Sequence, residues 1–103
     1  MTNMIFFSEF INQLEHLCAN TNNKDYIEDR LGKHSKILVI KNFIAEARKL
    51  IEHGEYHIAL ENLLLNLDEV SIKLDKKAIE SARMALGKRL SIENEELLKN
   101  LSL

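Results

Sequence analysis

Proline is absent from this 103-residue chain, and glycine occurs only three times, at Gly32, Gly54 and Gly87. Sheet-rich domains need many tight turns, and tight turns favour these two residue types. Helices joined by short polar links need far fewer of them. The scarcity of both residues therefore predicts a single all-α domain over residues 1–103, a compact bundle of about five to six helices.

Cysteine and long apolar runs are equally scarce. Cys18 is the only cysteine, so an intrachain disulfide is impossible and a reducing compartment is expected. No apolar run reaches the roughly 18 residues that a membrane span requires. The apolar start breaks at Ser8 and has no basic leader, unlike a signal peptide. The sequence therefore predicts a cytoplasmic protein that does not enter a membrane.

Strong net charge and cofactor-binding motifs are lacking too. The formal net charge of −2 argues against direct nucleic-acid binding, and the composition, 46% apolar and 29% charged, is that of a folded protein. There is no glycine-rich phosphate loop, nucleophile elbow or cysteine cluster. We therefore expect a protein that binds other proteins, with no cofactor, no small-molecule substrate and no catalytic activity.

What the sequence does contain is a series of amphipathic stripes, in which apolar residues recur at the three- and four-residue steps of one helix face. Ser35 and Asp75 are expected to begin helices, and Gly32 and Gly54 to end them. Residues 70–74 alternate like a strand without an obvious partner, so we expect an extended link pinned to the core. The stripes predict helices over residues 3–19, 24–31, 35–53, 55–67 and 75–90, and a last helix starting at Ser91 or Asn94.

Charged residues are sorted by segment. No lysine or arginine lies between Glu52 and Glu69, whereas the flanking residues 33–49 and 73–89 are rich in both. One explanation is that acidic and basic helices pair with each other, in surface ion pairs of small value. The other is that the acidic helix forms a patch facing a cationic partner, which would speed encounter and reject wrong partners. The acids of this segment are Glu52, Glu55, Glu61, Asp68 and Glu69.

His53 and His57 lie four residues apart with a carboxylate between them, a spacing that invites a zinc interpretation. The zinc-protease pattern needs glutamate directly after the first histidine, on one continuous helix. Gly54 occupies that position and is expected to break the helix. We therefore expect no metal site here.

Arg48 and His53 form an R-x4-H pattern, which resembles the motif of HEPN-type ribonucleases. In that family the two residues meet across a helical dimer and cleave RNA by acid–base and charge-stabilising chemistry. The family places a polar, non-basic residue directly after the arginine, and this chain has Lys49. An HEPN-like ribonuclease is therefore one alternative function, and a non-catalytic helical adaptor is another.

Two short segments, GEYHIALE at residues 54–61 and LGKRL at residues 86–90, are separated by an extended IKL at residues 72–74. Together they resemble the MafI-like immunity proteins, small partners of polymorphic bacterial toxins that include the CdiI-type proteins of contact-dependent growth inhibition. The likeness covers roughly the C-terminal half of the chain. It implies that Gly54, Ala59, Leu60 and Leu86 maintain the fold and do not contact the partner.

The resemblance also implies a function. The chain would bind and neutralise the C-terminal domain of a cognate toxin, one to one, and the expected toxin is a nuclease, in particular a ribonuclease. Nucleases carry cationic clefts for phosphate, so carboxylates placed over such a cleft would mimic the charge of the substrate. Tyrosine is a favoured interface anchor. The predicted contact residues are Glu55, Tyr56, Glu61, Asp68 and Glu69, with Asp25, Tyr26 and Asp29 as a second candidate cluster.

Overall fold

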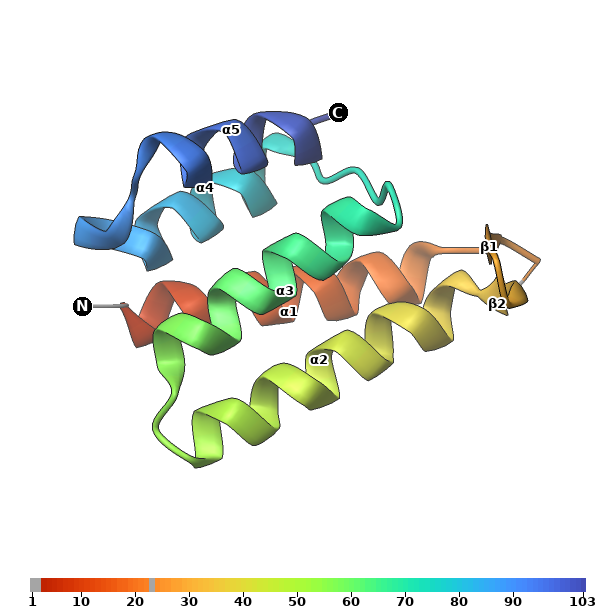
Figure 1. Ribbon diagram of the computed structural model, residues 1–103, viewed down its shortest axis with the longest axis horizontal. Helices are drawn as coiled ribbons and strands as arrows, with labels where there is room; N and C mark the ends of the chain where they lie inside the picture. The colour runs from red at the N-terminus through yellow and green to blue at the C-terminus, as the bar shows by residue number, and fades with distance from the viewer. Residues whose placement is uncertain (1–2, 23) are drawn as a thin grey trace.

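Five α-helices form most of the computed structural model, which describes residues 3–22 and 24–103. The predicted all-α bundle is confirmed in part: the described residues are mostly helical, and they also form one small antiparallel hairpin that was not predicted. Figure 1 shows the hairpin at one end of the bundle, with the start of α1 at the other. The elements are α1 (Met4–Asn20), β1 (Tyr26–Asp29), β2 (Gly32–Ser35), α2 (Lys36–Glu52), α3 (Tyr56–Glu69), α4 (Lys76–Leu86), the 3-10 turn η1 (Gly87–Arg89) and α5 (Ile92–Leu101).

Side-chain caps begin three of the helices at the expected residues. Ser35, Asp75 and Ser91 each accept a hydrogen bond from the backbone N–H three residues further on, at 3.4, 2.9 and 3.1 Å. Each bond satisfies one of the N–H groups that a helix start leaves without an intrahelical partner. Ser91, and not Asn94, is therefore the cap of α5. α4 ends at Leu86, four residues earlier than predicted, because Gly87 takes a positive φ of 52° and begins η1.

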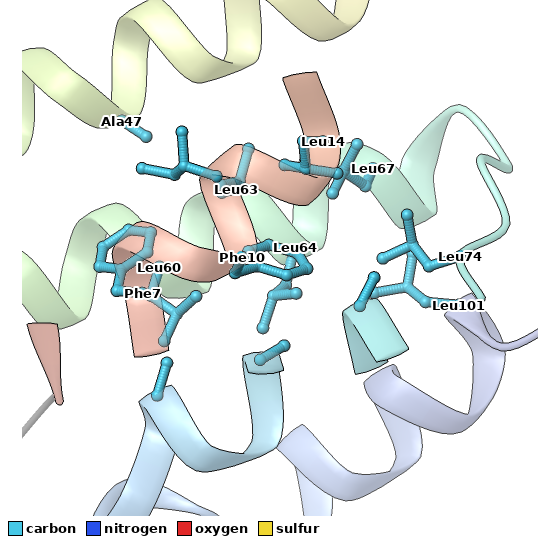
Figure 2. Packing of buried hydrophobic residues seen from close by; sticks show 14 of the residues in the cluster. Phe7, Phe10, Leu14, Ala47, Leu60, Leu63, Leu64, Leu67, Leu74 and Leu101 are labelled. Carbon is cyan, nitrogen blue, oxygen red and sulfur yellow. The ribbon is translucent and has the colours of Figure 1, made fainter. Parts of the chain in front are cut away.

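The core lies between the helices: α1 packs on α4 and α2, α2 packs on α3, and α5 packs on both α3 and α4. Figure 2 shows Phe7 and Phe10 of α1 among the leucines of α3, with Leu74 and Leu101 closing one side. Burying such side chains stabilises the fold by about 1.5–3 kcal/mol each. The largest fully buried side chains are Phe7, Phe10, Leu14, Ile40, Leu60, Leu63, Leu64, Leu67, Ile72, Leu86, Leu98 and Leu101.

α2 and α3 are joined by a tight turn at Gly54, as the sequence predicts. The N–H of Gly54 donates to the carbonyl of Ile51 (3.0 Å), and that of Glu55 donates to the carbonyl of Leu50 (2.9 Å). These two bonds form a Schellman motif, which requires a left-handed residue at its centre. Gly54 supplies it with a φ of 75°. The two helices consequently pack as neighbours.

The predicted extended link is found at residues 72–74, where it has a partner, whereas Val70 and Ser71 form the turn that ends α3. Leu74 forms an isolated parallel bridge with Ser102, beyond the end of α5. The Leu74 N–H donates to the carbonyl of Leu101 (2.7 Å), and its carbonyl accepts from the N–H of Leu103 (3.0 Å). Ile72 and Leu74 are both buried, so the link joins the core.

The predicted helix over residues 24–31 is wrong, because this segment forms β1 and the turn of a hairpin. Tyr26 pairs with Ser35 and Asp29 pairs with Gly32, across a link of two residues. So short a helix would be marginal, since nucleation is costly and, among the segment's described side chains, only Ile27 reaches the core even partly. Pairing with residues 32–35 gives the backbone its hydrogen-bond partners instead. Gly32 has a φ of 120°, so it enters β2 and does not end a helix.

Candidate partner-binding site

A groove of about 410 Å³ lies between α3 and α5, which pack against each other. We call it the acidic groove, because three carboxylates line it and no lysine or arginine does. Leu65 and Leu97 supply apolar surface between the carboxylates. Its lining residues are Glu61, Leu65, Glu93, Asn94, Glu96, Leu97 and Asn100.

Helical spacing places these side chains on facing walls. Glu61 and Leu65 are one turn apart on α3, beside the stripe of leucines that faces the core. On α5, Glu93 and Glu96 are three residues apart, and both lie on the flank of the buried Leu97. Leu97 is buried, whereas Leu65 is 55% exposed and available to a partner. The groove therefore combines negative charge with accessible apolar surface.

In the described part of the chain, none of the ion pairs includes an acid of the segment from Glu52 to Glu69. The basic helix α2 nevertheless packs on the acidic helix α3. The explanation by helix pairing and the explanation by an acidic patch therefore both stay open. The ion pairs that do form are Arg48–Glu15 (3.1 Å), Arg83–Glu80 (2.7 Å) and Arg83–Glu95.

Glu95 differs from its neighbours on α5, because it faces α4 and not the groove. Its carboxylate accepts hydrogen bonds from the guanidinium of Arg83, and these bonds hold the pKa of Glu95 below its usual range. The same hydrogen bonds raise the pKa of Arg83. Arg83 thus fixes α5 to α4 and leaves Glu93 and Glu96 without a neutralising partner among the described residues.

The predicted contact residues of the acidic helix lie at separate places along α3. Glu61 lines the acidic groove. Glu55 is the residue before α3 and Tyr56 its first, and both are exposed at the N-terminal end. Asp68 is half-buried, about 10 Å beyond Glu61 along the helix axis. Glu69 lines a different groove, beside the hairpin.

The second predicted cluster belongs to the hairpin. Asp25 is exposed just before β1, and its carbonyl accepts a hydrogen bond from the N–H of Lys36 (3.0 Å). Tyr26 begins β1 and is 60% exposed. Asp29 ends β1, and its side chain lies outside the described part of the structure. The hairpin therefore presents Asp25 and Tyr26 at the end of the bundle, away from the acidic groove.

Sequence reasoning missed Glu93 and Glu96, the carboxylates that line the same groove as Glu61. Their only signal in the sequence is a cluster of acids at the start of a short helix, which is also typical of favourable helix-dipole placement. Nothing local indicates that α5 packs beside α3. The groove is therefore a product of tertiary packing.

Arg48, one of the two residues of the ribonuclease alternative, lies at the seam between α1 and α2. Arg48 lines the groove between these helices, of about 770 Å³, and its Nη2 donates to Glu15 (3.1 Å). His53 follows α2, with its Nδ1 2.8 Å from the carbonyl oxygen of Lys49. Arg48 and His53 are thus held by different contacts at the end of α2. The ribonuclease alternative, which requires a dimer, stays a prediction.

Cys18 lies in the same seam, on the floor of the groove between α1 and α2. Burial raises the pKa of its thiol, so the reactive thiolate is disfavoured. His53 and His57 are separated by the turn at Gly54. Among the described residues there is no group of three or more histidine, cysteine, aspartate or glutamate side chains that could hold a metal ion. The described helices also include none with the length and apolar character needed to cross a membrane.

Comparisons with protein-family models, with curated proteins and with solved structures find no match. The resemblance to MafI-like immunity proteins therefore rests on the quoted segments alone and stays a prediction. The site has to be interpreted from its own chemistry.

Proposed function

We propose that this chain is an immunity protein, which binds the C-terminal domain of a cognate bacterial toxin one to one through the acidic groove. The observation that carries the proposal is the convergence of Glu61, Glu93 and Glu96 on one groove that no cation lines. The resemblance of residues 54–61 and 86–90 to MafI-like immunity proteins supplies the class of partner. A toxin that acts on nucleic acid would present the cationic surface that such a groove complements.

The physical case rests on unfavourable charge. Carboxylates that line one groove repel one another, and a cationic partner would relieve this repulsion. A cationic partner would be attracted over a long range, which speeds association, and partners with negative surfaces would be rejected. Compared with the predicted patch on α3 alone, the proposal keeps Glu61 and adds two carboxylates from α5. It assigns the protein no catalytic role.

The test begins with the partner. The C-terminal domain encoded by the reading frame immediately upstream is co-expressed with this chain, and stoichiometry is measured by light scattering after size-exclusion chromatography. We expect a one-to-one complex and protection of cells from the toxin domain. Because steering is electrostatic, the association rate should fall as salt rises.

Charge reversal then tests the groove itself. Glu61→Lys combined with Glu96→Lys should reduce the association rate at least about tenfold and remove most of its salt dependence. The matched control is Glu9→Lys with Glu46→Lys, which makes the same change in net charge at exposed positions of α1 and α2 outside the groove. If both double variants behave alike, the acidic groove is not the binding site.

A further inference from the structure

A second groove borders the same face of the molecule, on the other side of α3. It has a volume of about 610 Å³ and lies between the hairpin, α2 and the end of α3. We call it the hairpin groove. Its charged and polar lining residues are Arg30, His34, Asn42 and Glu69, and the others are apolar. Its apolar lining residues are Ile27, Leu31, Val39, Phe43 and Val70.

The two grooves are separated only by the exposed ridge of α3. Leu65 lines the acidic groove, and Glu69 lines the hairpin groove. The two residues are four positions apart, about 6 Å along the helix axis. Ile58 and Leu65 add exposed apolar surface to this ridge. In Figure 1 the ridge of α3 faces the viewer, between α5 and α2.

Charge and apolar surface have different effects on binding. Carboxylates around a groove mainly speed encounter and select the partner, whereas a buried apolar anchor mainly slows dissociation. Leu31 is 88% exposed at the tip of the hairpin, and it borders half-buried Val39 and Phe43 in the groove. An exposed apolar side chain over a preformed apolar groove is the arrangement typical of an anchor pocket.

We propose that the hairpin groove receives an apolar side chain from the same partner whose cationic residues enter the acidic groove. This inference rests on the proposed function and specifies the partner further. The partner presents an amphipathic helix that crosses the ridge of α3, with lysine or arginine over Glu61 and Glu96 and a large aliphatic or aromatic residue beside Leu31.

Two synthetic peptides test the proposal without knowledge of the toxin. One is a helical peptide of leucine and lysine with one apolar face, and the other contains lysine only. Binding of each is measured by fluorescence anisotropy at low salt, and the contact surface is mapped by backbone amide chemical shifts. We expect the leucine–lysine peptide to perturb amides of α3, α5 and the hairpin, and the lysine peptide to perturb only those beside the acidic groove.

Variants separate the two halves of the face. Leu31→Gln should raise the Kd of the leucine–lysine peptide about tenfold and leave the Kd of the lysine peptide unchanged. Val39→Thr, which preserves volume, should act in the same direction. Leu38→Gln is the matched control, because Leu38 is a 61% exposed leucine of α2 that lines neither groove. Glu61→Lys with Glu96→Lys should weaken both peptides.

The outcomes distinguish the inference from the proposed function. If Leu31→Gln and Val39→Thr leave the leucine–lysine peptide as tightly bound as Leu38→Gln does, while the charge reversals weaken it, the anchor pocket is overturned and the acidic groove stands. If the charge reversals leave both peptides unaffected, the acidic groove is overturned as well. Shifts confined to α1 or α4 would overturn both.

Discussion

Phe10 occupies the centre of the core, where the aromatic side chains of α1 meet the leucines of α3 (Figure 2). Its side chain is fully buried, so Phe10→Ala would remove a large apolar group and leave a cavity that the neighbouring leucines only partly fill. The expected cost is about 3–5 kcal/mol in the free energy of unfolding, measured by urea denaturation. Ile5→Ala, on the exposed face of the same helix, should cost less than about 0.5 kcal/mol. Equal costs would contradict the assignment of the core.

The contribution of Glu95 on α5 to the stability of the fold should depend on pH. Arg83 holds the pKa of Glu95 down in the folded state, so the unfolded state binds a proton at higher pH than the folded state does. The stabilisation is therefore complete above the pKa of unfolded glutamate and is lost as pH falls through the folded pKa. Glu95→Gln should lower stability at pH 7, and its difference from the wild type should vanish in acid.

Glu96→Gln is the control for this titration. It makes the same change one residue away, where no ion pair joins the carboxylate to a cation among the described residues. Urea midpoints recorded from neutral to acid pH should therefore separate the two variants only above the range in which glutamate titrates. Two superimposable curves would show that the contact with Arg83 contributes nothing.

At the scale of elements, the helices could be predicted from the sequence and the hairpin could not. The stripe of α1 and the caps Ser35 and Asp75 are local signals, so their meaning does not depend on distant residues. Asp25 and Gly32 are ambiguous, because an early acid and a late glycine bracket a short helix and a two-residue hairpin equally well. Only pairing of residues 26–29 with residues 32–35 decides between them, and that pairing is not a local property.

The ends of α2 and α3 offer a matched pair of backbone substitutions. α3 ends in the same Schellman motif as α2, since the N–H groups of Ser71 and Ile72 donate to the carbonyls of Asp68 and Leu67, both at 3.0 Å. Ser71 occupies the left-handed position with a φ of 59°, where Gly54 stands in the other motif. A left-handed conformation costs a residue with a Cβ about 1 kcal/mol.

The two exchanges should therefore have opposite signs. Ser71→Gly should raise the free energy of unfolding by up to about 1 kcal/mol, and Gly54→Ala should lower it by about 1 kcal/mol or more. The Cβ added at Gly54 would meet no neighbouring atom within 4 Å, so the loss would report backbone conformation alone. Thermal or urea unfolding of both variants tests the pair, and a stability loss in Ser71→Gly would refute the interpretation.

At the scale of the whole molecule, the candidate site depends on packing that no local pattern encodes. The sequence indicated an acidic α3, and Glu61 does line the groove. Its counterparts on α5 lie more than 30 positions further along the chain. They reach the groove because the leucines of α5 pack on α3 and α4 while Arg83 holds Glu95 on the other side. The acidic groove therefore depends on the packing of α5 on α3, on its packing on α4 and on the contact between Arg83 and Glu95. The periodicity of the sequence alone could not predict this combination.

This arrangement predicts a conflict between stability and binding. Glu61 and Glu96 line one groove without a cation, so the double variant Glu61→Gln with Glu96→Gln relieves repulsion in the free protein. It should raise the free energy of unfolding at low salt by about 0.3 kcal/mol, with the gain disappearing at high salt, and it should weaken binding of the lysine peptide. Glu15→Gln removes the partner of Arg48, so it should not stabilise the protein and should leave peptide binding unchanged. A double variant that is both less stable and fully competent to bind would mean that these carboxylates serve the fold and not a partner.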